Sequence, residues 1–354
     1  MHFLSFYKRS AFPGFVIIFF IFLLSGGCGI FKSGKTTTLP TADTLSISFY
    51  NVENLFDTLD DPAIADEDFT PEGKLKWNTD RYRKKLENLS RVVEAMSYPS
   101  ILGLAEIENR SVLEDWINYG SMKMQNYAIV HFDSPDERGI DVAMIYKKSD
   151  FRVSDSRIIP VNLPDVEDMV DNKTRDVLVV NGFLKNKPVV LFFNHWPSRG
   201  GGQQKTEPLR KHVAQIVRTE IEPLLANGSR VVIIGDFNDE PDNNSVAQVL
   251  KAGKIETPVS KNELYNCFYE SHQKGEGTYN FRGNWNQLDQ LIVSGNLLSA
   301  DSDCSVVKAE VFKKDWMLYD DKKYGPLPNR TYGGPNYYGG YSDHLPILAR
   351  LVLR

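Results

Sequence analysis

The sequence has few cysteines and only a small net charge. Three cysteines in 354 residues are too few for a disulfide framework. Cys28 lies in a leader-like segment, and the remaining Cys267 and Cys304 could pair in an oxidising compartment. A net charge of −5 excludes the attraction of nucleic acid or anionic membrane by bulk charge. Any polyanionic substrate must therefore be held locally, with the help of a cation.

The sequence also lacks an apolar run that is long enough to cross a membrane comfortably as a helix. The run at 15–24 follows Lys8 and Arg9 and leads through small residues to Cys28. This arrangement resembles a bacterial lipoprotein signal, in which the cysteine is lipidated and becomes the mature N-terminus. Ser25 stands where such signals usually carry leucine, so a plain signal peptide or an uncleaved anchor is the alternative.

We expect three parts in the chain: a lipoprotein signal segment at 1–28, a tether at 29–43 and a folded domain at 44–354. The tether is rich in Lys, Ser, Thr, Gly and Pro, which is typical of flexible linkers. The chain is 42% hydrophobic and 25% charged, an ordinary globular composition. These features predict an extracytoplasmic protein that a lipid anchors to a membrane, with secretion as the alternative.

Strand and helix patterns alternate along the folded part. Apolar positions on one helical face predict helices at 79–96 and 208–225, and a shorter helix follows at 245–250. Short apolar or alternating runs predict strands at 45–50, 101–105, 143–146, 177–183, 189–193, 231–234, 288–293 and 345–353. The alternation indicates an α/β fold.

The two halves of the folded part resemble each other. Phe-Tyr-Asn at 49–51 is echoed by Phe-Phe-Asn at 192–194, and the strand that ends in Glu106 is echoed by the strand that ends in Asp236. The shared order predicts two related β/α layers that pack face to face, with polar strand ends meeting in one groove. Chance similarity among short apolar strands is the alternative.

Five short motifs carry a family resemblance. They are Asn51 in Phe-Tyr-Asn-Val-Glu-Asn, Glu106 in Gly-Leu-Ala-Glu-Ile-Glu-Asn, Gly-Asp-Phe-Asn at 235–238, Leu-Asp at 288–289 and Ser-Asp-His-Leu-Pro at 342–346. In this order they resemble the endonuclease/exonuclease/phosphatase superfamily, which includes deoxyribonucleases, abasic-site endonucleases, sphingomyelinases and inositol-polyphosphate phosphatases. The resemblance implies a four-layer α/β sandwich of two packed mixed sheets with helices outside. It also implies metal-dependent hydrolysis of a phosphate ester.

Glu106 is the first choice for a metal ligand because a carboxylate is a hard donor. Mg²⁺ prefers one or two carboxylates together with water and substrate oxygens, and Mn²⁺ or Ca²⁺ are alternatives. Asn51 can add a neutral oxygen, and Asp343 can complete or orient the shell. A solvated acid at a strand end is the competing interpretation of Glu106.

His344 is the best general base, because a histidine with a pKa of about 6.5 can accept a proton from water. The family resemblance makes Asp289 the acid that orients it. Asp236 and Asn238 would hold the attacking water and a phosphate oxygen. A hydrogen-bonded structural histidine is the alternative.

His195 resembles a phosphate-contacting or proton-donating histidine of the deoxyribonuclease branch. From the internal repeat we predict that Asp141 supports His195 as Asp289 supports His344. Arg175 resembles a phosphate-binding arginine, since a guanidinium can grip phosphate with two donors. A surface ion pair between Arg175 and Asp176 is equally compatible with the sequence.

Three segments could select the substrate, and the first is 194–202, whose glycines can bring backbone close to a ligand. Residues 277–285 and 332–341 combine aromatic side chains with arginine or glycine, and aromatic faces beside cations can stack exposed bases. Rigid loops that only shape the groove are the alternative. We favour a monomeric nuclease that cleaves DNA or RNA. A phospholipid phosphodiesterase of the sphingomyelinase kind, a phosphatase for small metabolites, and a surface binding protein without catalysis remain alternatives.

Overall fold

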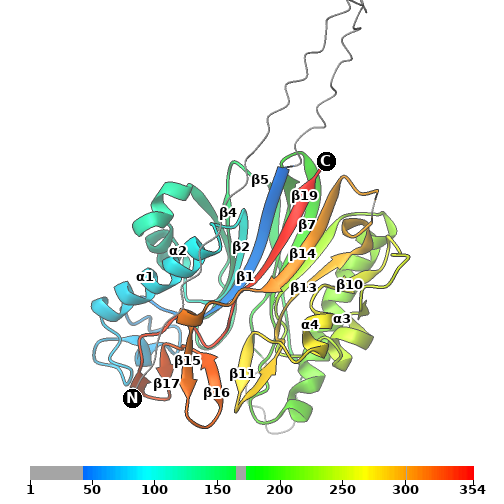
Figure 1. Ribbon diagram of the computed structural model, residues 1–354. Coiled ribbons are helices and arrows are strands. Elements are labelled where there is room, and N and C mark those ends of the chain that lie inside the picture. The colour runs from blue at the N-terminus through cyan, green and yellow to red at the C-terminus, as the bar shows by residue number, and fades with distance from the viewer. Residues whose placement is uncertain (1–42, 165–172, 300) are drawn as a thin grey trace, which may run out of the picture. The chain divides into compact units, whose positions relative to one another are not determined.

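Two large β-sheets pack face to face, and helices cover their outer faces (Figure 1). The computed structural model describes residues 43–164, 173–299 and 301–354. The expected signal segment with Cys28 and nearly all of the tether lie outside these residues. Within the described ranges, we find no helix with the length and hydrophobicity of a membrane span.

The first sheet has a parallel strand pair at its centre. In sheet order its strands are β14 (Cys304–Val311), β19 (Ile347–Leu353), β1 (Asp43–Leu55), β2 (Ile101–Ile107), β4 (Asp141–Lys147) and β3 (Tyr127–His131). Strands β1 and β2 run parallel, and all other neighbours are antiparallel. Strand β19 pairs with β1 from Leu353 beside Asp43 to Ile347 beside Phe49.

The second sheet repeats this arrangement. In sheet order its strands are β5 (Phe151–Ile159), β6 (Val177–Leu184), β7 (Lys187–His195), β8 (Val231–Asp236), β13 (Asp289–Ser294), β10 (Leu264–Asn266) and β9 (Ala252–Gly253). Strands β7 and β8 are parallel, with antiparallel β6 and β13 on either side. The first sheet has β1 and β2 between antiparallel β19 and β4, so the similar halves predicted from the sequence have the same strand order.

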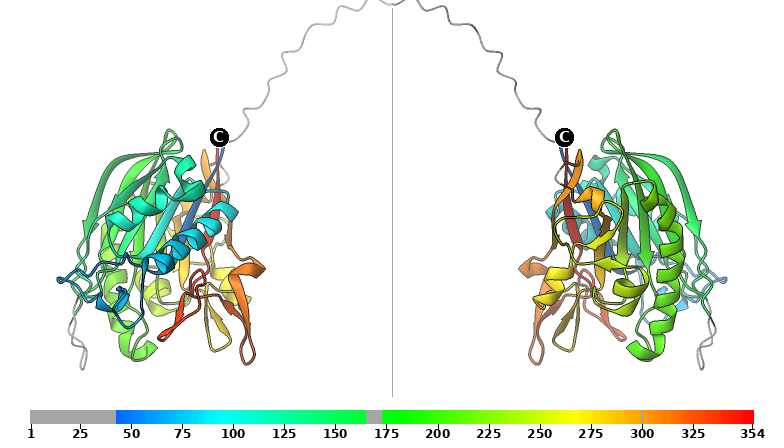
Figure 2. Two further views of the ribbon diagram at one scale, coloured as in Figure 1. Left: turned by 90° about the vertical axis from the view of Figure 1, so that its left-hand side faces the viewer. Right: turned by 90° about the vertical axis from the view of Figure 1, so that its right-hand side faces the viewer.

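Helices α1 (Thr79–Ala95) and α2 (Arg110–Ile117) pack on the first sheet, and α3 (Gln203–Ala226) packs on the second (Figure 2). Asparagine side chains at positions 78 and 109 cap α1 and α2 by accepting backbone N–H groups. Helix α3 begins at Gln203, earlier than the predicted start at Pro208, and contains the proline. Pro208 is the sixth residue of α3, past the first turn, so its missing N–H leaves one carbonyl of that turn without a helical hydrogen bond.

Three apolar cores separate four layers, so the predicted four-layer α/β sandwich is confirmed. In the core between the sheets, Phe49 and Phe193 pack against Gly103. A Cβ on Gly103 would lie 2.5 Å from the Phe193 ring. The glycine is therefore needed for the close approach of the two sheets.

Short elements surround one end of the sandwich (Figure 1). They include the hairpin β11 (Tyr279–Phe281) and β12 (Asn284–Asn286), the hairpin β15 (Leu318–Asp321) and β16 (Gly325–Pro328), and the pair β17 (Tyr332–Gly333) and β18 (Asn336–Tyr337). Helix α4 (Tyr269–Gln273), a π-helical turn (Ser245–Val249) and 3-10 turns (Glu67–Phe69, Gly120–Gln125, Gly295–Leu297, Asp315–Met317) complete the fold. The hairpin β11–β12 forms part of the rim of the site described next.

Candidate active site

Four polar side chains leave the carboxyl ends of the two parallel strand pairs. Asn51 and Glu106 lie near the ends of β1 and β2, and His195 and Asp236 end β7 and β8. The Asn51 side-chain amide joins the halves by donating to Asp236 at 3.1 Å and to Glu106 at 3.4 Å. The groove predicted at the meeting of polar strand ends is therefore present.

A pocket of about 740 Å³ opens at this edge. Most of the predicted site residues line it, and they come from both halves of the chain: Asn51, Glu106, Arg175, His195, Asp236, Asn238, Asp343 and His344. Asp289 lies directly behind His344, and Asp141 is the one predicted catalytic residue that is elsewhere.

His344 and Asp289 form a buried pair. His344 Nδ1 lies 2.7 Å from Asp289 Oδ2, and His344 Nε2 lies 3.9 Å from Asp236 Oδ2. The Ser342 hydroxyl accepts the backbone N–H of His344 at 3.0 Å, which fixes the chain at the ring. Burial works to lower the pKa of His344, but the carboxylates of Asp289 and Asp236 outweigh it and hold that pKa well above its ordinary value.

Asp236 and Asn238 are held in a tight turn after β8. Asp236 Oδ1 accepts the backbone N–H of Asn238 at 2.9 Å, and Asn238 has a positive φ of 49°. The Asn238 amide donates to the Trp196 carbonyl at 3.0 Å. Burial raises the pKa of Asp236 to about 6, against the opposing effect of the His344 charge. The Asp236 carboxylate is therefore ionised near neutral pH and lies beside two imidazoles.

His195 is buried near acids yet stays uncharged. Its Nε2 lies 3.6 Å from Asp236 Oδ2 and 4.0 Å from Glu106 Oε1. Burial and the positive charges of Arg175 and Arg138 hold its pKa well below the ordinary value. Its buried Nδ1 has no hydrogen-bond partner in the part of the chain that the structure describes.

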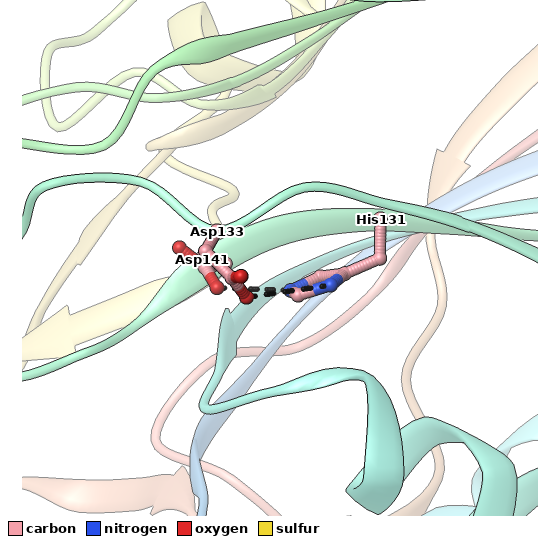
Figure 3. A group of neighbouring side chains, drawn as sticks. All are labelled: His131, Asp133 and Asp141. Carbon is pink, nitrogen blue, oxygen red and sulfur yellow. Dashed lines mark hydrogen bonds and ion pairs between the residues drawn. The ribbon is translucent and has the colours of Figure 1, made fainter.

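The prediction that Asp141 supports His195 is wrong (Figure 3). Asp141 Oδ2 lies 2.9 Å from Nε2 of His131, and Asp141 Oδ1 accepts the backbone N–H of Ser134 at 2.8 Å. His131 lies opposite Ala143 in the β3–β4 pair. It is therefore a diagonal neighbour of Asp141, two residues along β4, and reaches it directly. The internal repeat preserves strand order but not this side-chain pairing.

Asp133 and Asp141 both lie beside His131, with Asp133 Oδ1 3.9 Å from Nδ1 of the histidine (Figure 3). The three side chains could hold a metal ion by proximity. Asp133 is exposed, however, and Asp141 already uses both oxygens in hydrogen bonds. The group is therefore best described as a clamp on the loop between β3 and β4.

Arg175 is buried rather than paired on the surface. Its Nη1 donates to Asp136 at 3.0 Å and its Nη2 to the Trp196 carbonyl at 2.7 Å. Asp176, the alternative partner, instead accepts the backbone N–H of Val161, so the surface ion pair is wrong. The Arg175 Nε has no partner among the described residues, and the side chain lines the pocket.

The carboxylate of Glu106 is crowded by other acids, as expected for a cation site. Burial and the negative charge of Asp343 raise the pKa of Glu106. The backbone N–H of Asn54 donates to Glu106 Oε2 at 3.0 Å. Asn51 turns its oxygen toward the backbone N–H of Glu53 at 3.0 Å, so its Nδ2 rather than its oxygen faces Glu106. The donors around the pocket are hard oxygens, which fit Mg²⁺ or a similar ion.

A second group of possible metal ligands, Asp236, Asp289 and His344, has donor atoms within 4.8 Å of one another. Asp289 is already committed to the ring of His344, which favours a proton-transfer role for this group. Cys267 and Cys304, the two cysteines that the structure describes, are free thiols.

Two arginines near the pocket were missed in the sequence. Arg138 lines the pocket from the β3–β4 loop, and Arg330 Nη2 donates to Asp343 at 2.8 Å. Arg138 is three residues before the predicted site residue Asp141, which was the only available signal. No local pattern marks Arg330.

Three solved structures illustrate the shared fold. Humanised D. rerio TDP2 with 14 mutations matches with a TM-score of 0.53 at 16% identity, over 87% of this chain and 98% of that chain. An endonuclease/exonuclease/phosphatase family protein from Bacteroides thetaiotaomicron gives 0.53 at 16% identity, over 89% and 96%. D. rerio TDP2 complexed with single strand DNA product gives 0.51 at 16% identity, over 87% and 98%.

A search of curated protein sequences gives no significant match. The sequence profile of the Endonuclease/Exonuclease/phosphatase family, in contrast, matches residues 46–352, which span both sheets and every residue of the pocket. The chain therefore belongs to the endonuclease/exonuclease/phosphatase family, whose members hydrolyse phosphoric esters with the help of a divalent metal ion.

Proposed function

We propose that this protein is a nuclease in which His344 acts as general base and Glu106 as the principal metal ligand. The observation that carries the proposal is the buried His344–Asp289 pair at 2.7 Å, which lies beside Asp236 at the pocket. A histidine oriented by a carboxylate is suited to proton transfer. The family membership supports phosphoric ester hydrolysis as the reaction class.

The pair can activate a water molecule. With Nδ1–H donated to Asp289, the Nε2 of His344 is the free acceptor and faces the pocket. It takes a proton from a water whose oxygen bonds to phosphorus while the P–O bond to the leaving group breaks, and Asp289 stabilises the imidazolium that forms. The Asp236 carboxylate lies 3.9 Å from this nitrogen and can orient the same water.

Other residues can bind the phosphate. Neutral His195 donates a hydrogen bond, Asn238 offers its amide, and Arg175 contributes a buried positive charge. Glu106 and Asp343 would hold the cation, and Asn51 would join them if its amide turned. When bound, such an ion polarises phosphoryl oxygens and stabilises the leaving oxygen.

The hairpin β11–β12 supports nucleic acid as the substrate. Phe281 lines the pocket with 53% of its surface exposed, and the Arg282 guanidinium lies 5.1 Å from its ring centre. An exposed aromatic face beside a cation can stack a base. D. rerio TDP2, which shares the fold, was solved with a single strand DNA product. A phospholipid or a small phosphate ester remains an alternative outcome of the test below.

We also propose that Cys28 is lipidated and that the enzyme is anchored outside the cytoplasm as a monomer. The basic pair, the apolar run 15–24 and the small residues before Cys28 support this proposal. The Cys28→Ala protein, expressed in a bacterium with lipoprotein processing, is expected to lose labelling by a fatty acid analogue and leave the membrane fraction. Retention of both label and membrane association would contradict the proposal.

The test compares the parent with His344→Ala on plasmid DNA, single-stranded RNA, sphingomyelin and an inositol phosphate, with Mg²⁺, Mn²⁺ or EDTA. We expect nucleic acid cleavage that EDTA abolishes, and a fall in kcat of about 10²–10⁴-fold in His344→Ala. His212→Ala on α3 is the control, because His212 lies outside the pocket. Near-parent turnover by His344→Ala would refute the base assignment. Cleavage of only sphingomyelin or inositol phosphate would refute the nuclease.

A further inference from the structure

Helix α1 carries a polar stripe beside its apolar face, and the middle of this stripe is buried. Arg81, Lys85, Asn88 and Arg91 are spaced by four, three and three residues, so they lie on one side of the helix. Lys85 is only 1% exposed and Asn88 only 5%. Burying a lysine costs free energy unless its charge is compensated. A requirement other than helix packing must account for it.

The stripe holds residues 331–341, the segment that leads to the proposed general base His344. Lys85 Nζ donates to the Thr331 hydroxyl at 2.6 Å and to the Tyr341 carbonyl at 2.9 Å. The Asn88 amide donates to the carbonyl oxygens of Gly339 at 2.9 Å and Gly340 at 2.7 Å. These bonds reach to within three residues of Asp343 and His344.

The two arginines at the ends of the stripe also contact the 331–341 segment. The Arg81 guanidinium lies 4.3 Å from the ring centre of Tyr337, and Arg91 Nη1 donates to the Tyr341 hydroxyl at 2.7 Å. Tyr341 is buried, so it is unavailable to stack bases. Tyr341 thus fits the rigid-loop alternative considered from the sequence, whereas Tyr338 in the same loop is exposed.

Glu53 holds the segment from the side of β1. Its carboxylate accepts the backbone N–H groups of Thr331 at 2.6 Å and Tyr332 at 3.2 Å. Arg330 extends this network, with its guanidinium 3.6 Å from Glu53 and 2.8 Å from Asp343. The segment is therefore fixed from two elements at once.

Such fixing is needed because the large sheets do not provide it. Pairing between β14 and β19 extends only to Val311 and Ile347. The intervening chain pairs within its own short hairpins and, at His344, through one antiparallel bridge to Tyr279. His344 must nevertheless reach Asp289 and face Asp236. Active-site groups need placement to a fraction of an ångström, which supporting residues supply.

We infer that Lys85 and Asn88 are positioning residues, which set His344 and Asp343 in the active site through the 331–341 segment. The inference rests on the proposed function for its kinetic consequences. It assigns a role in catalysis to a helix that does not line the pocket.

Kinetics of the full chain on bis(p-nitrophenyl) phosphate with Mg²⁺ test the inference. In Lys85→Met and Asn88→Ala we expect kcat to fall at least tenfold while KM changes less than threefold, since binding groups outside the segment remain. Lys84→Met is the matched control, because Lys84 is exposed and its one ion pair among the described residues is with Glu87. Asn88→Ala leaves no buried charge unpaired, so it remains informative if Lys85→Met does not fold.

A stability control separates positioning from simple loss of structure. Val93→Ala weakens the apolar face of α1 without touching the stripe. At temperatures where each variant is folded, we expect Val93→Ala to keep the parental kcat and Asn88→Ala to lose it. Parental kcat in both stripe variants, whatever their melting temperatures, would overturn the inference.

A readout without substrate distinguishes this inference from the proposed function. The side-chain ¹⁵N resonances of His344, assigned with His344→Gln, report its hydrogen bond to Asp289. We expect these resonances to shift in Asn88→Ala and to stay unchanged in Lys84→Met. Unchanged resonances in Asn88→Ala would overturn the positioning role. A parent that hydrolyses neither the diester nor nucleic acid would overturn the proposed function alone.

Discussion

The two histidines of the pocket differ in charge because their neighbours differ. The carboxylates of Asp289 and Asp236 raise the pKa of His344 against the effect of burial, whereas burial and nearby arginines lower the pKa of His195. The two rings are therefore not interchangeable, although each half of the internal repeat contains one of them. One is suited to accept a proton and the other to donate a hydrogen bond as a neutral ring.

The pH dependence of activity should follow the His344–Asp289 pair. A base must be neutral to act, so kcat should rise with pH, with a midpoint above the ordinary histidine value of about 6.5. Asp289→Asn removes the charge that stabilises the imidazolium. We expect the midpoint to move to lower pH and the plateau to fall by at least ~10²-fold. A pH–rate profile measures both, and a midpoint that stays or rises would contradict the pairing.

Glu106→Gln should act through the metal. The amide loses the negative charge that favours a cation, so we expect the Mg²⁺ concentration for half-maximal activity to rise by at least about tenfold. Metal titration of activity provides the measurement. Glu108→Gln is the control, because Glu108 is also a buried acid but does not line the pocket. Equal metal requirements in the two variants would argue against Glu106 as ligand.

The positions of single site residues could be predicted where the neighbouring sequence determines them. Glu106 and Asp236 follow buried strands directly, so their place at a sheet edge could be inferred from the pattern. The partner of Asp141 could not, because it depends on the register of β3 against β4. Lys85 and Thr331 are 246 positions apart, and no local pattern links them.

At the scale of elements, the β3–β4 loop links the clamp to the pocket. His131, Asp141 and Ser134 hold its two ends, and Asp136 on the same loop binds Arg175. The clamp thus stabilises the side of the pocket that carries Arg138 and Arg175 without contacting the reacting atoms.

Asp141→Ala should therefore affect stability more than chemistry. It leaves the Ser134 N–H and the His131 ring without their acceptor, which costs about 1–3 kcal/mol of unfolding free energy. We expect kcat to stay within a few-fold of the parent. Denaturant unfolding and steady-state kinetics measure the two effects. A loss of kcat as large as that of His344→Ala would restore a direct catalytic role for Asp141.

Helices and strands were predicted well where their buried apolar residues recur at regular intervals along the sequence. Strand β1 and helix α1 were found because their apolar positions recur every second residue or along one helical face. Strand β5 was missed because its central residues face solvent and read as Arg, Ser and Asp. Helix α2 has only eight residues, too few to establish a helical period.

The whole molecule depends on close contact between the sheets. Gly103→Ala would bring a methyl group 2.5 Å from the Phe193 ring, so we expect a loss of about 1–3 kcal/mol of unfolding free energy. Gly253→Ala is the matched control in the second sheet, because its methyl group would meet no atom within 4 Å. Denaturant unfolding compares them. Equal stabilities would mean that the sheets can separate at no cost.

The pairing of Asp43 with Leu353 puts both ends of the described chain at the same end of the paired strands β1 and β19. From Asp43 to Asn51 a strand advances about 26 Å, so this end of the strands is far from the pocket. If a solid support were coupled just before Asp43 or after Arg354, the opening of the pocket would face away from the support. Immobilised in this way, it could still receive a bulky polymer.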